Sequence, residues 1–225
     1  TYQAFLLDPW VLNLGIRYDD HSEFSPETTY QASSAYTVDA TGTKVKGSIG
    51  TGFKAPSSYQ LYSSFFGNPD LQPETSRGWE VGLEQEIHTN RASAGITYFN
   101  TEYKDLIDYN FATFTFDNIS KANTDGVEVY GKASIMENLL LRIGYTYLDN
   151  DDEAGGSFTI RRPRHQIDTD LNYAATKNLN LNLYAGFIGS RDDISGGTVY
   201  QLDPYALVNL SVRYRITELV EIYGR

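Results

Sequence analysis

The sequence predicts an all-β protein of the antiparallel transmembrane β-barrel class, and three observations support this. Several segments alternate apolar and polar residues with a period of two, which places successive side chains on opposite faces of a strand. The connections between these segments are alternately short and long, as in barrels whose turns and loops lie on opposite sides of a membrane. Tyrosine dominates the aromatic residues, with 18 Tyr against 11 Phe and 2 Trp, and its amphipathic ring suits a membrane interface.

The first segment with a clear alternation covers residues 10–19. Its apolar face holds Trp10, Leu12, Leu14, Ile16 and Tyr18, and its polar face holds Asn13, Gly15, Arg17 and Asp19. Further strands with the same alternation are expected at 79–84, 139–147, 167–173, 179–187 and 208–216. A wet barrel lumen accepts charges of both signs on such polar faces, whereas the core of a β-sandwich excludes them. Residues 1–225 are therefore expected to belong to a single barrel domain and to supply about twelve of its strands.

The predicted connections are of two kinds. Short turns are expected at 7–9, 40–43, 87–90, 136–138, 174–177 and 217–218. Longer polar loops are expected at 20–28, 54–75, 105–114, 150–162 and 190–203. Tyrosines near strand ends are expected to form belts at the membrane interfaces; they are Tyr18, Tyr30, Tyr36, Tyr98, Tyr145, Tyr147, Tyr173, Tyr184 and Tyr214.

Composition excludes several classes of function. The net charge of −11 argues against a nucleic-acid partner. The absence of cysteine excludes a disulfide scaffold, a thiolate metal site and a cysteine nucleophile. Mean hydropathy is −0.41, and no apolar run approaches the length that a spanning helix needs. The Ser, His and Asp residues fall on different predicted strands without a nucleophile elbow, so no catalytic site and no enzyme activity are expected.

Three stretches around the longest predicted loop carry the most specific signal. They are residues 50–57 (GTGFKAPS), 60–62 (QLY) and 67–76 (GNPDLQPETS). Further matches follow in the same order at 105–109 (DLIDY), 118–128 (NISKANTDGVE) and 161–165 (RRPRH). With these motifs the chain resembles the TonB-dependent outer-membrane transporters, and within them the cobalamin receptor branch.

The resemblance implies a barrel of about twenty-two strands around a plug, of which this chain supplies about the tenth to the twenty-first. The plug, the amino-terminal segment that binds the energy coupler TonB, the first strands and the closing strand are then expected to lie outside this chain. It also implies a monomer in the outer membrane of a Gram-negative bacterium, surrounded by lipid and lipopolysaccharide. The implied activity is energy-coupled uptake of a bulky, scarce nutrient, with cobalamin or another corrinoid as the first choice.

The candidate ligand-binding residues lie in the predicted loops. One aromatic group consists of Tyr59, Tyr62, Phe65 and Phe66, followed by Asn68, and a second consists of Tyr109, Phe111, Phe114 and Phe116. These rings are expected either to pack on a bulky organic ligand or to pack on one another and order the loops. Arg161 and Arg162, together with Arg164, are expected to bind an anionic group on a ligand or lipopolysaccharide, or to form ion pairs with the acidic run at 149–153.

The remaining charged groups have simpler interpretations. The acidic run at 149–153 has enough oxygen ligands for calcium but lacks the EF-hand spacing, so a solvated acidic loop is favoured and no cofactor or metal is expected. Charged side chains on the predicted lumen face are expected to contact the plug; they are Arg17, Lys44, Lys46, Glu80, Glu84, Glu128, Lys132, Arg142 and Arg213.

Three alternatives remain open at this stage. A ferric-siderophore receptor of the same fold differs only in its loop chemistry. A complete twelve-stranded porin or outer-membrane enzyme is the second, and a soluble all-β binding domain is the third. The charged polar faces and the alternating loop lengths argue against the third.

Overall fold

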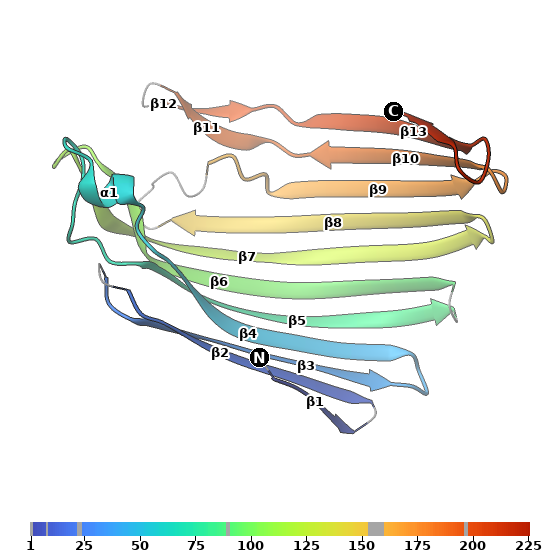
Figure 1. The fold of residues 1–225 in the computed structure, drawn as a ribbon, viewed down its shortest axis with the longest axis horizontal. Helices are drawn as coiled ribbons and strands as arrows, with labels where there is room; N and C mark the ends of the chain where they lie inside the picture. The colour runs from blue at the N-terminus through green and yellow to red at the C-terminus, as the bar shows by residue number, and fades with distance from the viewer. Residues whose placement is uncertain (1, 8, 22–23, 89–90, 153–159, 196–197) are drawn as a thin grey trace.

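The computed structural model describes residues 2–7, 9–21, 24–88, 91–152, 160–195 and 198–225. Twelve strands form one antiparallel sheet in which each strand is hydrogen-bonded to the next (Figure 1). They are, in spatial order, β1 (Tyr2–Leu7), β2 (Trp10–Asp19), β3 (Glu27–Val38), β4 (Thr43–Lys54), β5 (Glu74–His88), β6 (Ala92–Asn110), β7 (Thr115–Met136), β8 (Leu139–Asp152), β9 (His165–Ala174), β10 (Leu179–Ile188), β13 (Tyr205–Arg215) and β14 (Glu221–Gly224). A separate hairpin consists of β11 (Arg191–Ser195) and β12 (Thr198–Leu202), and one short helix, α1 (Ser58–Tyr62), precedes β5.

The predicted antiparallel all-β fold and the number of strands in its sheet are confirmed. Within the described ranges the sheet is open, with β1 and β14 at its two edges, and no plug domain accompanies it. The described residues contain no helix that is long and apolar enough to cross a membrane.

The connections alternate in length, as predicted. Short connections join β1 to β2, β3 to β4, β5 to β6, β7 to β8, β9 to β10 and β13 to β14 at one end of the sheet, which we call the turn end. The opposite end, which we call the loop end, carries α1 and the hairpin β11–β12 (Figure 1). In the described ranges, the elements that interrupt the up-and-down order of the strands, α1 and the hairpin β11–β12, therefore both lie at the loop end.

Besides α1, which lies within the predicted loop 54–75, the loop end differs from prediction chiefly in two places where strands form. Residues 105–110 were expected to be loop, but β6 continues to Asn110 and only 111–114 connect it to β7. Residues 190–203 were also expected to be loop, but they contain the hairpin β11–β12. In both places polar side chains occupy both faces of a strand, so alternation of hydrophobicity does not distinguish the strand from a loop.

The strand register assembles one continuous apolar face. Val45 on β4 lies opposite Leu83 on β5, Leu83 opposite Ile96 on β6, and Ile96 opposite Val129 on β7. Antiparallel partners point to the same side of a sheet, so each such row extends the face by one strand. The side chains on this face are largely exposed, with Ile16 at 77%, as expected of a surface that a bilayer covers.

The opposite face of the sheet is polar and carries ion pairs between strands. Lys44 Nζ lies 3.7 Å from Glu84 Oε1, and Arg142 NH1 lies 3.4 Å from Asp170 Oδ1. The register also places the other charged residues that were expected to face the lumen on this side of the sheet, from Arg17 on β2 to Arg213 on β13. Tyr184 lies between two apolar-face residues of β10, so its side chain is on the polar face, opposite Asp170. Its assignment to an interfacial belt was therefore wrong.

Glycines on the polar face give room to aromatic rings. A Cβ at Gly126 would overlap the backbone carbonyl of Tyr147 and would lie 2.7 Å from the ring of Phe99. Gly95 is likewise covered by the ring of Tyr130. Each ring therefore fills space that a side chain at the glycine would otherwise occupy, and it reaches across from the neighbouring strand.

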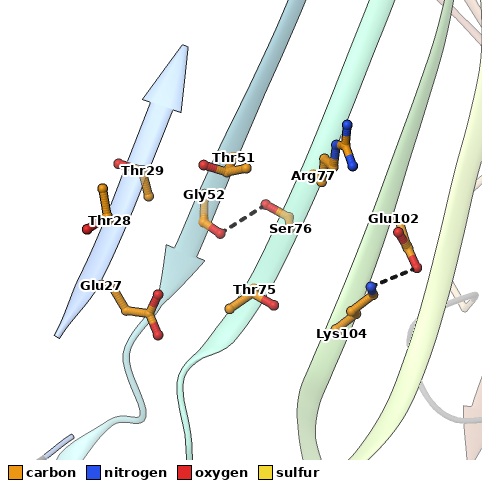
Figure 2. Close-up of a pocket in the computed structure, with 10 residues that line it drawn as sticks. All are labelled: Glu27, Thr28, Thr29, Thr51, Gly52, Thr75, Ser76, Arg77, Glu102 and Lys104. Carbon is orange, nitrogen blue, oxygen red and sulfur yellow. Dashed lines mark hydrogen bonds and ion pairs between the residues drawn. The ribbon is translucent and has the colours of Figure 1, made fainter. Parts of the chain in front are cut away.

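Towards the loop end the apolar face becomes polar. Beyond the aromatic residues of β5 and β6, Thr51, Arg77, Glu102 and Lys104 line a hollow of about 260 Å³ (Figure 2). The strands β6 and β7 have 19 and 22 residues, whereas about 9–11 residues cross a bilayer. Their outer parts therefore extend beyond the apolar band and form a platform for the β4–β5 connection.

Most of the buried apolar side chains of the described chain also belong to the loop end. They are Leu61, Leu71 and Ala122, and Leu71 is 1% exposed. Leu61 lies on α1 and Leu71 lies in the segment that leads into β5. The β4–β5 connection is thus a packed structure with its own small core.

Candidate functional site

The β4–β5 connection, residues 55–73, begins with the capped helix α1. Ser57 is the N-cap: its hydroxyl accepts from the backbone N–H of Gln60 at 3.3 Å, and its own backbone N–H donates to Gln60 Oε1 at 2.8 Å. This reciprocal pair is a capping box, which satisfies two donors that a helix leaves unpaired at its start. Even a helix of five residues is held in place here, and Leu61 is buried beneath it.

Gly67 lets the chain turn back tightly against α1. Its backbone N–H donates to the carbonyl of Ser63 at 2.9 Å, and the N–H of Asn68 donates to the carbonyl of Gln60 at 2.8 Å. A Cβ at Gly67 would lie 2.6 Å from the nitrogen of Ser63 and 2.8 Å from the carbonyl oxygen of Leu61. The glycine is required because backbone, which cannot move aside, occupies that space.

Asn68 fastens this turn to the start of β7. Its Nδ2 donates to the carbonyl of Phe116 at 2.9 Å and to Asp117 Oδ1 at 3.1 Å. In addition, the N–H of Phe116 donates to the carbonyl of Phe66 at 3.1 Å. Two segments almost fifty residues apart in the sequence are thereby held side by side.

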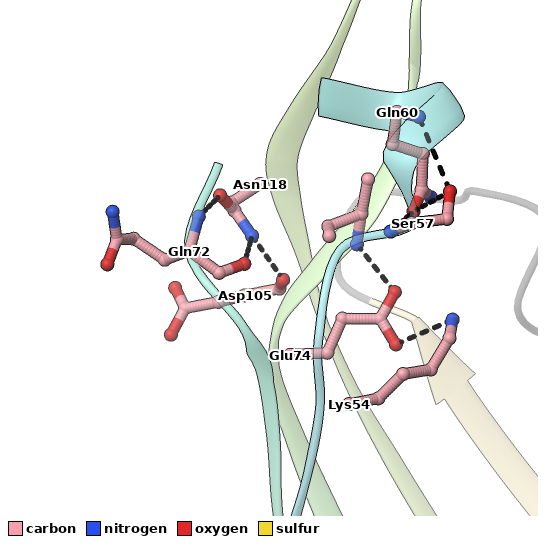
Figure 3. A network of polar contacts seen from close by, with 8 residues as sticks. Lys54, Ser57, Gln60, Gln72, Glu74, Asp105 and Asn118 are labelled. Carbon is pink, nitrogen blue, oxygen red and sulfur yellow. Dashed lines mark hydrogen bonds and ion pairs between the residues drawn. The ribbon is translucent and has the colours of Figure 1, made fainter. Parts of the chain in front are cut away.

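A second set of contacts fastens the segment before β5, as Figure 3 shows. Asn118 accepts from the N–H of Gln72 at 2.9 Å, and its Nδ2 donates to the carbonyl of Gln72 at 2.9 Å and to that of Asp105 at 2.6 Å. Glu74 accepts from the N–H of Ile107 at 3.1 Å and from Lys54 Nζ at 3.0 Å. The second half of the connection is therefore bound to β6 and β7, and the Lys54–Glu74 pair joins its two ends.

The two predicted aromatic groups come together as one cluster, which we call the aromatic cluster. Tyr109 lies at its centre: its ring centroid is 5.6 Å from that of Phe66, 5.6 Å from that of Phe116 and 5.0 Å from that of Phe111. Tyr59 contacts Phe116 at 5.9 Å, and Phe65 contacts Phe66 at 6.1 Å. Several of these pairs meet edge to face, the arrangement that aromatic quadrupoles favour.

The rim of the aromatic cluster is open to solvent. Phe65 is 84% exposed and Phe111 is 78% exposed. Tyr59, Tyr62 and Phe114 are also exposed, whereas Tyr109 and Phe116 are half-buried. The cluster thus combines an inner part, which orders the loops, with an outer part that presents aromatic faces above the sheet. An exposed aromatic surface of this kind is typical of an interaction site.

Asp117 is the charged group beneath the aromatic cluster. Four side chains donate to its carboxylate: Asn110 at 2.8 Å, Thr113 and Asn68 at 3.1 Å, and Thr115 at 3.3 Å. These hydrogen bonds, chiefly that from Asn110, lower the pKa of Asp117, although partial burial opposes them. The ionised carboxylate therefore organises the tip of the β6–β7 hairpin.

Three non-glycine residues of the described chain have positive φ, and all belong to the loop end. Asp105 (φ 57°) lies at the irregularity in β6, Phe114 (φ 60°) lies in the tip between β6 and β7, and Arg161 (φ 61°) precedes β9. A left-handed conformation is unfavourable for a large side chain such as phenylalanine. Such strain persists where the surrounding contacts impose it, and it is found most often at functional sites.

The arginines lie apart from the described contacts of the aromatic cluster. Arg161 Nε lies 2.8 Å from Asp193 Oδ1, and its backbone N–H donates to the carbonyl of Asp192 at 2.7 Å, which links the β8–β9 connection to the hairpin β11–β12. Arg164 lies 3.3 Å from Asp149 Oδ1, so it forms the ion pair with the acidic run that was one of the two alternatives expected for the arginines. Arg162 is half-buried and also has an interaction partner. The hydrogen bond from the backbone N–H of Ile194, and after it the neighbouring Arg161, lower the pKa of Asp193.

The acidic run is only partly described. Asp149 is paired with Arg164, Asp151 and Asp152 end β8, and Glu153 lies outside the described residues. In the described ranges no group of three or more His, Asp or Glu side chains is arranged to hold a metal ion.

The sequence analysis selected side chains that face outwards from this site. It missed the side chains that hold the segments of the site together. Asn118, Asp117 and Glu74 each bridge two segments, yet none was selected from the sequence. Asn118 opens one of the quoted motifs, and Glu74 lies in another, so the motifs themselves were the available signal.

Comparison with known proteins identifies the family. The family model described as TonB dependent receptor-like, beta-barrel matches residues 2–224. The vitamin B12 transporter BtuB of Vibrio vulnificus is 30% identical over 222 residues, which cover 96% of this chain and 31% of that protein. BtuB of Vibrio cholerae serotype O1 is also 30% identical, over 96% of this chain and 35% of that protein. The chain therefore spans about a third of the length of these relatives.

Solved structures agree on the fold. A variant of the ferric enterobactin receptor PfeA from Pseudomonas aeruginosa superposes with a TM-score of 0.80 at 21% identity, over 98% of this chain and 37% of that one. The siderophore receptor PirA from the same organism superposes with a TM-score of 0.77 at 24% identity, over 98% of this chain and 40% of that one. Because the family model matches nearly every residue, this chain belongs to the TonB-dependent receptors and forms part of their β-barrel.

Proposed function

We propose that this chain is the strand-rich part of an outer-membrane receptor that takes up a corrinoid, such as cobalamin, by energy-coupled transport and without catalysis. The observation that carries the proposal is the aromatic cluster, whose exposed rings lie at the loop end, where the relatives' family binds its ligands. The identity to vitamin B12 transporters supports the choice of ligand.

The charges of the loop end support a corrinoid over an anionic ferric siderophore. A site for an anion needs cations that are not already neutralised, but Arg161 and Arg164 are each paired with a carboxylate. Aromatic faces, in contrast, bind a large organic ring system through apolar contact and stacking. The proposed contacts are Tyr59, Tyr62, Phe65, Phe66, Tyr109 and Phe111, with Asn68 holding the loop and Arg161 and Arg162 bordering the site.

The remaining partners follow from membership in the family. The protein is proposed to act as a monomer in the outer membrane of a Gram-negative bacterium, in contact with lipid and lipopolysaccharide. The polar face of the sheet, with its pairs Lys44–Glu84 and Arg142–Asp170, is proposed to face a plug. Energy is proposed to come from TonB through a segment outside this chain, and no bound cofactor or calcium ion is needed for the contacts described.

The test is equilibrium binding to the protein at its natural length, in detergent, of cyanocobalamin and of a panel of ferric siderophores. Phe65→Ala and Phe111→Ala are expected to weaken cyanocobalamin binding about tenfold each, since an aromatic contact with a ligand is worth about 1–3 kcal/mol. Tyr173→Ala, which removes a ring at the turn end, is the control and is expected to bind normally. Binding of a siderophore in place of any corrinoid would overturn the choice of ligand and retain the receptor.

A further inference from the structure

The outer part of the β6–β7 hairpin extends beyond the rest of the sheet. Towards the loop end, the last pair between β5 and β6 is Thr75–Lys104, and the last pair between β7 and β8 is Ala122–Asp152. Within the described ranges, residues 105–121 of β6 and β7 pair with each other and with no further strand. A two-stranded hairpin has little stability of its own. Contacts outside the ladder therefore fix the direction in which this part of the hairpin points.

The β6–β7 ladder is irregular at the point where the hairpin leaves the sheet. The register shifts between Tyr103 and Leu106 and shifts again between Leu106 and Ile107. Asp105 lies within this interruption and has a φ of 57°. Irregularities of this kind break the ladder locally and bend the strand. Residues 103–106 of β6 thus have the properties of a hinge, and we call them the hinge.

The β4–β5 connection is fastened to the part of the hairpin beyond the hinge. Asn118 exchanges two hydrogen bonds with the backbone of Gln72, and Asn68 Nδ2 donates to a backbone carbonyl of β7. The ring contacts of the aromatic cluster join the same two segments. We call residues 57–72 and 107–118 together the aromatic head. Because its two segments bind each other through hydrogen bonds and rings, the aromatic head is one body.

Glu74 links the aromatic head to the sheet across the hinge. It is the first residue of β5 and lies opposite Lys54 of β4. Its Oε2 accepts from Lys54 Nζ at 3.0 Å (Figure 3), and its Oε1 accepts from the backbone N–H of Ile107 at 3.1 Å. One carboxylate that starts from the sheet therefore holds the hairpin directly beyond its irregular ladder.

The carboxylate contributes more to this link than the lysine does. The side chain of Glu74 is 13% exposed, whereas that of Lys54 is 70% exposed. An exposed ion pair contributes little to stability, but an ionised acceptor forms a strong hydrogen bond with a backbone N–H. Glu74 and Lys54 belong to the polar face, as the pair Lys44–Glu84 does further along the same strands. The hydrogen bond to Ile107 therefore draws the aromatic head towards the polar face.

We propose that the aromatic head turns as one body about the hinge, and that Glu74 is the positioning residue that fixes its angle to the sheet. With the hydrogen bond to Ile107 formed, the exposed rings are held on the side of the sheet that faces the proposed lumen. Without this bond, the aromatic head keeps its internal contacts but takes a range of angles. The inference deepens the proposed function and rests on it, because it concerns the same aromatic cluster.

The test measures distances between pairs of spin labels in the protein at its natural length, in detergent. One pair of introduced cysteines, Ser64→Cys with Ala112→Cys, lies within the aromatic head. The second pair, Ala112→Cys with Asp151→Cys, spans the hinge. All three side chains are exposed, and this chain has no cysteine of its own; any cysteine elsewhere in the protein is replaced first. Glu74→Leu is expected to broaden the second distance distribution and to leave the first unchanged.

Cyanocobalamin binding is measured on the same variants without labels. Glu74→Leu is expected to weaken binding about tenfold, the loss that follows when about a tenth of the molecules hold the aromatic head at the binding angle. Glu74→Gln keeps an acceptor oxygen for the N–H of Ile107. It is expected to retain the narrow distribution and to bind within about twofold of the unmodified protein. Lys54→Met, which removes the exposed ion pair and keeps the carboxylate, is expected to behave like Glu74→Gln.

Glu102→Leu is the matched control. Glu102 also pairs with a lysine beside the aromatic head, with its Oε1 3.3 Å from Lys104 Nζ, but this pair lies within β6 and does not bridge to the aromatic head. It is expected to keep both distance distributions and normal binding. An unchanged second distribution in Glu74→Leu, or equal broadening in Glu102→Leu, would overturn the role of Glu74.

The remaining outcomes separate the parts of the inference. Broadening of the first distribution in Glu74→Leu would show that the aromatic head is not one body. Broadening of the second distribution with unchanged binding would overturn the positioning role in ligand binding. If the unmodified protein binds no corrinoid, the proposed function fails, whereas the distances still report on the hinge.

Discussion

Asn118 and Gln72 exchange two hydrogen bonds across 46 residues of sequence. The N–H of Gln72 donates to Asn118 Oδ1 at 2.9 Å, and Asn118 Nδ2 donates to the carbonyl of Gln72 at 2.9 Å. One side-chain amide thus takes the place of a backbone partner in a β-ladder, and it also reaches the carbonyl of Asp105 (Figure 3). The side-chain amide of Asn118 therefore docks the β4–β5 connection on β6 and β7 through hydrogen bonds.

Asn118→Asp is expected to release this connection while the sheet remains intact. The substitution keeps the shape of the side chain but removes the donor and places a carboxylate against two carbonyl oxygens. Each neutral hydrogen bond that is lost costs about 0.5–1.5 kcal/mol, and the substitution removes both bonds that Asn118 Nδ2 donates. Hydrogen exchange of residues 55–73 should accelerate, and exchange in β8 to β10 should stay unchanged.

Gln72→Ala is the control for that experiment. Among the described residues, the Gln72 side chain donates only to the nearby carbonyl of Asp70 at 3.2 Å, whereas the contacts of Gln72 with Asn118 use its backbone. Protection of residues 55–73 should therefore survive in Gln72→Ala. Equal exchange rates in Asn118→Asp and the unmodified protein would show that Asn118 does not hold the connection.

Acid is expected to loosen the tip of the β6–β7 hairpin through Asp117. Hydrogen bonds from Asn110 and three other side chains lower the pKa of Asp117 in the folded protein below its usual value of 3.8. A lowered folded-state pKa contributes stability that is complete above the unfolded pKa and is lost as the pH falls through the folded one. Protection factors at 110–117, from which the intrinsic pH dependence of amide exchange has been divided out, should thus be steady from neutral pH down to the usual pKa and should fall below it.

Asp117→Asn provides the comparison, because an amide presents one acceptor oxygen where the carboxylate presents two. The variant should show faster exchange at 110–117 already at neutral pH and should lack the additional loosening in acid. The same acid response in both proteins would assign it to another carboxylate.

The sequence allowed the sheet to be predicted because each membrane-crossing segment alternates with period two. Trp10 to Tyr18 on β2 illustrates this: their faces follow from spacing alone. The hairpin β11–β12 was missed although Gly196 and Gly197 supply a turn signal between its strands. Its strands are polar on both faces, so alternation carried no information there.

Only part of the candidate site could be predicted from the sequence: its exposed rings, but not the way they come together. The exposed rings Phe65 and Phe111 were selected because aromatic residues are conspicuous in a polar loop. Their meeting around Tyr109 was not deducible, because it depends on hydrogen bonds between segments about fifty residues apart. Asn68 and Asn118 form those bonds, and the composition of a loop does not reveal which distant backbone groups its amides reach.

Phe114→Gly is expected to separate strain from ligand contact. Phe114 has a φ of 60°, which a glycine adopts without the cost of about 1–3 kcal/mol that such strain carries. The hairpin tip should become more resistant to proteolysis, because the strain is relieved, while cyanocobalamin binding should stay normal, because Phe114 is not among the proposed ligand contacts. Ala112→Gly, in the same connection, is the control for chain flexibility. Weaker binding by Phe114→Gly than by Ala112→Gly would show that the ring of Phe114 also contacts the ligand.

Gly126→Ala is expected to destabilise the sheet, whereas Gly131→Ala, on the same strand, is not. A methyl group at Gly126 would meet the carbonyl oxygen of Tyr147 and the ring of Phe99, and the backbone atom cannot move aside. Overpacking of this kind costs about 1–3 kcal/mol. Nothing lies within 4 Å of a Cβ at Gly131, so its replacement should change the stability by less than about 0.5 kcal/mol. Urea unfolding in lipid vesicles, followed by the gel mobility of folded and unfolded protein, measures both free energies; equal stabilities would show that the ring of Phe99 does not require the glycine.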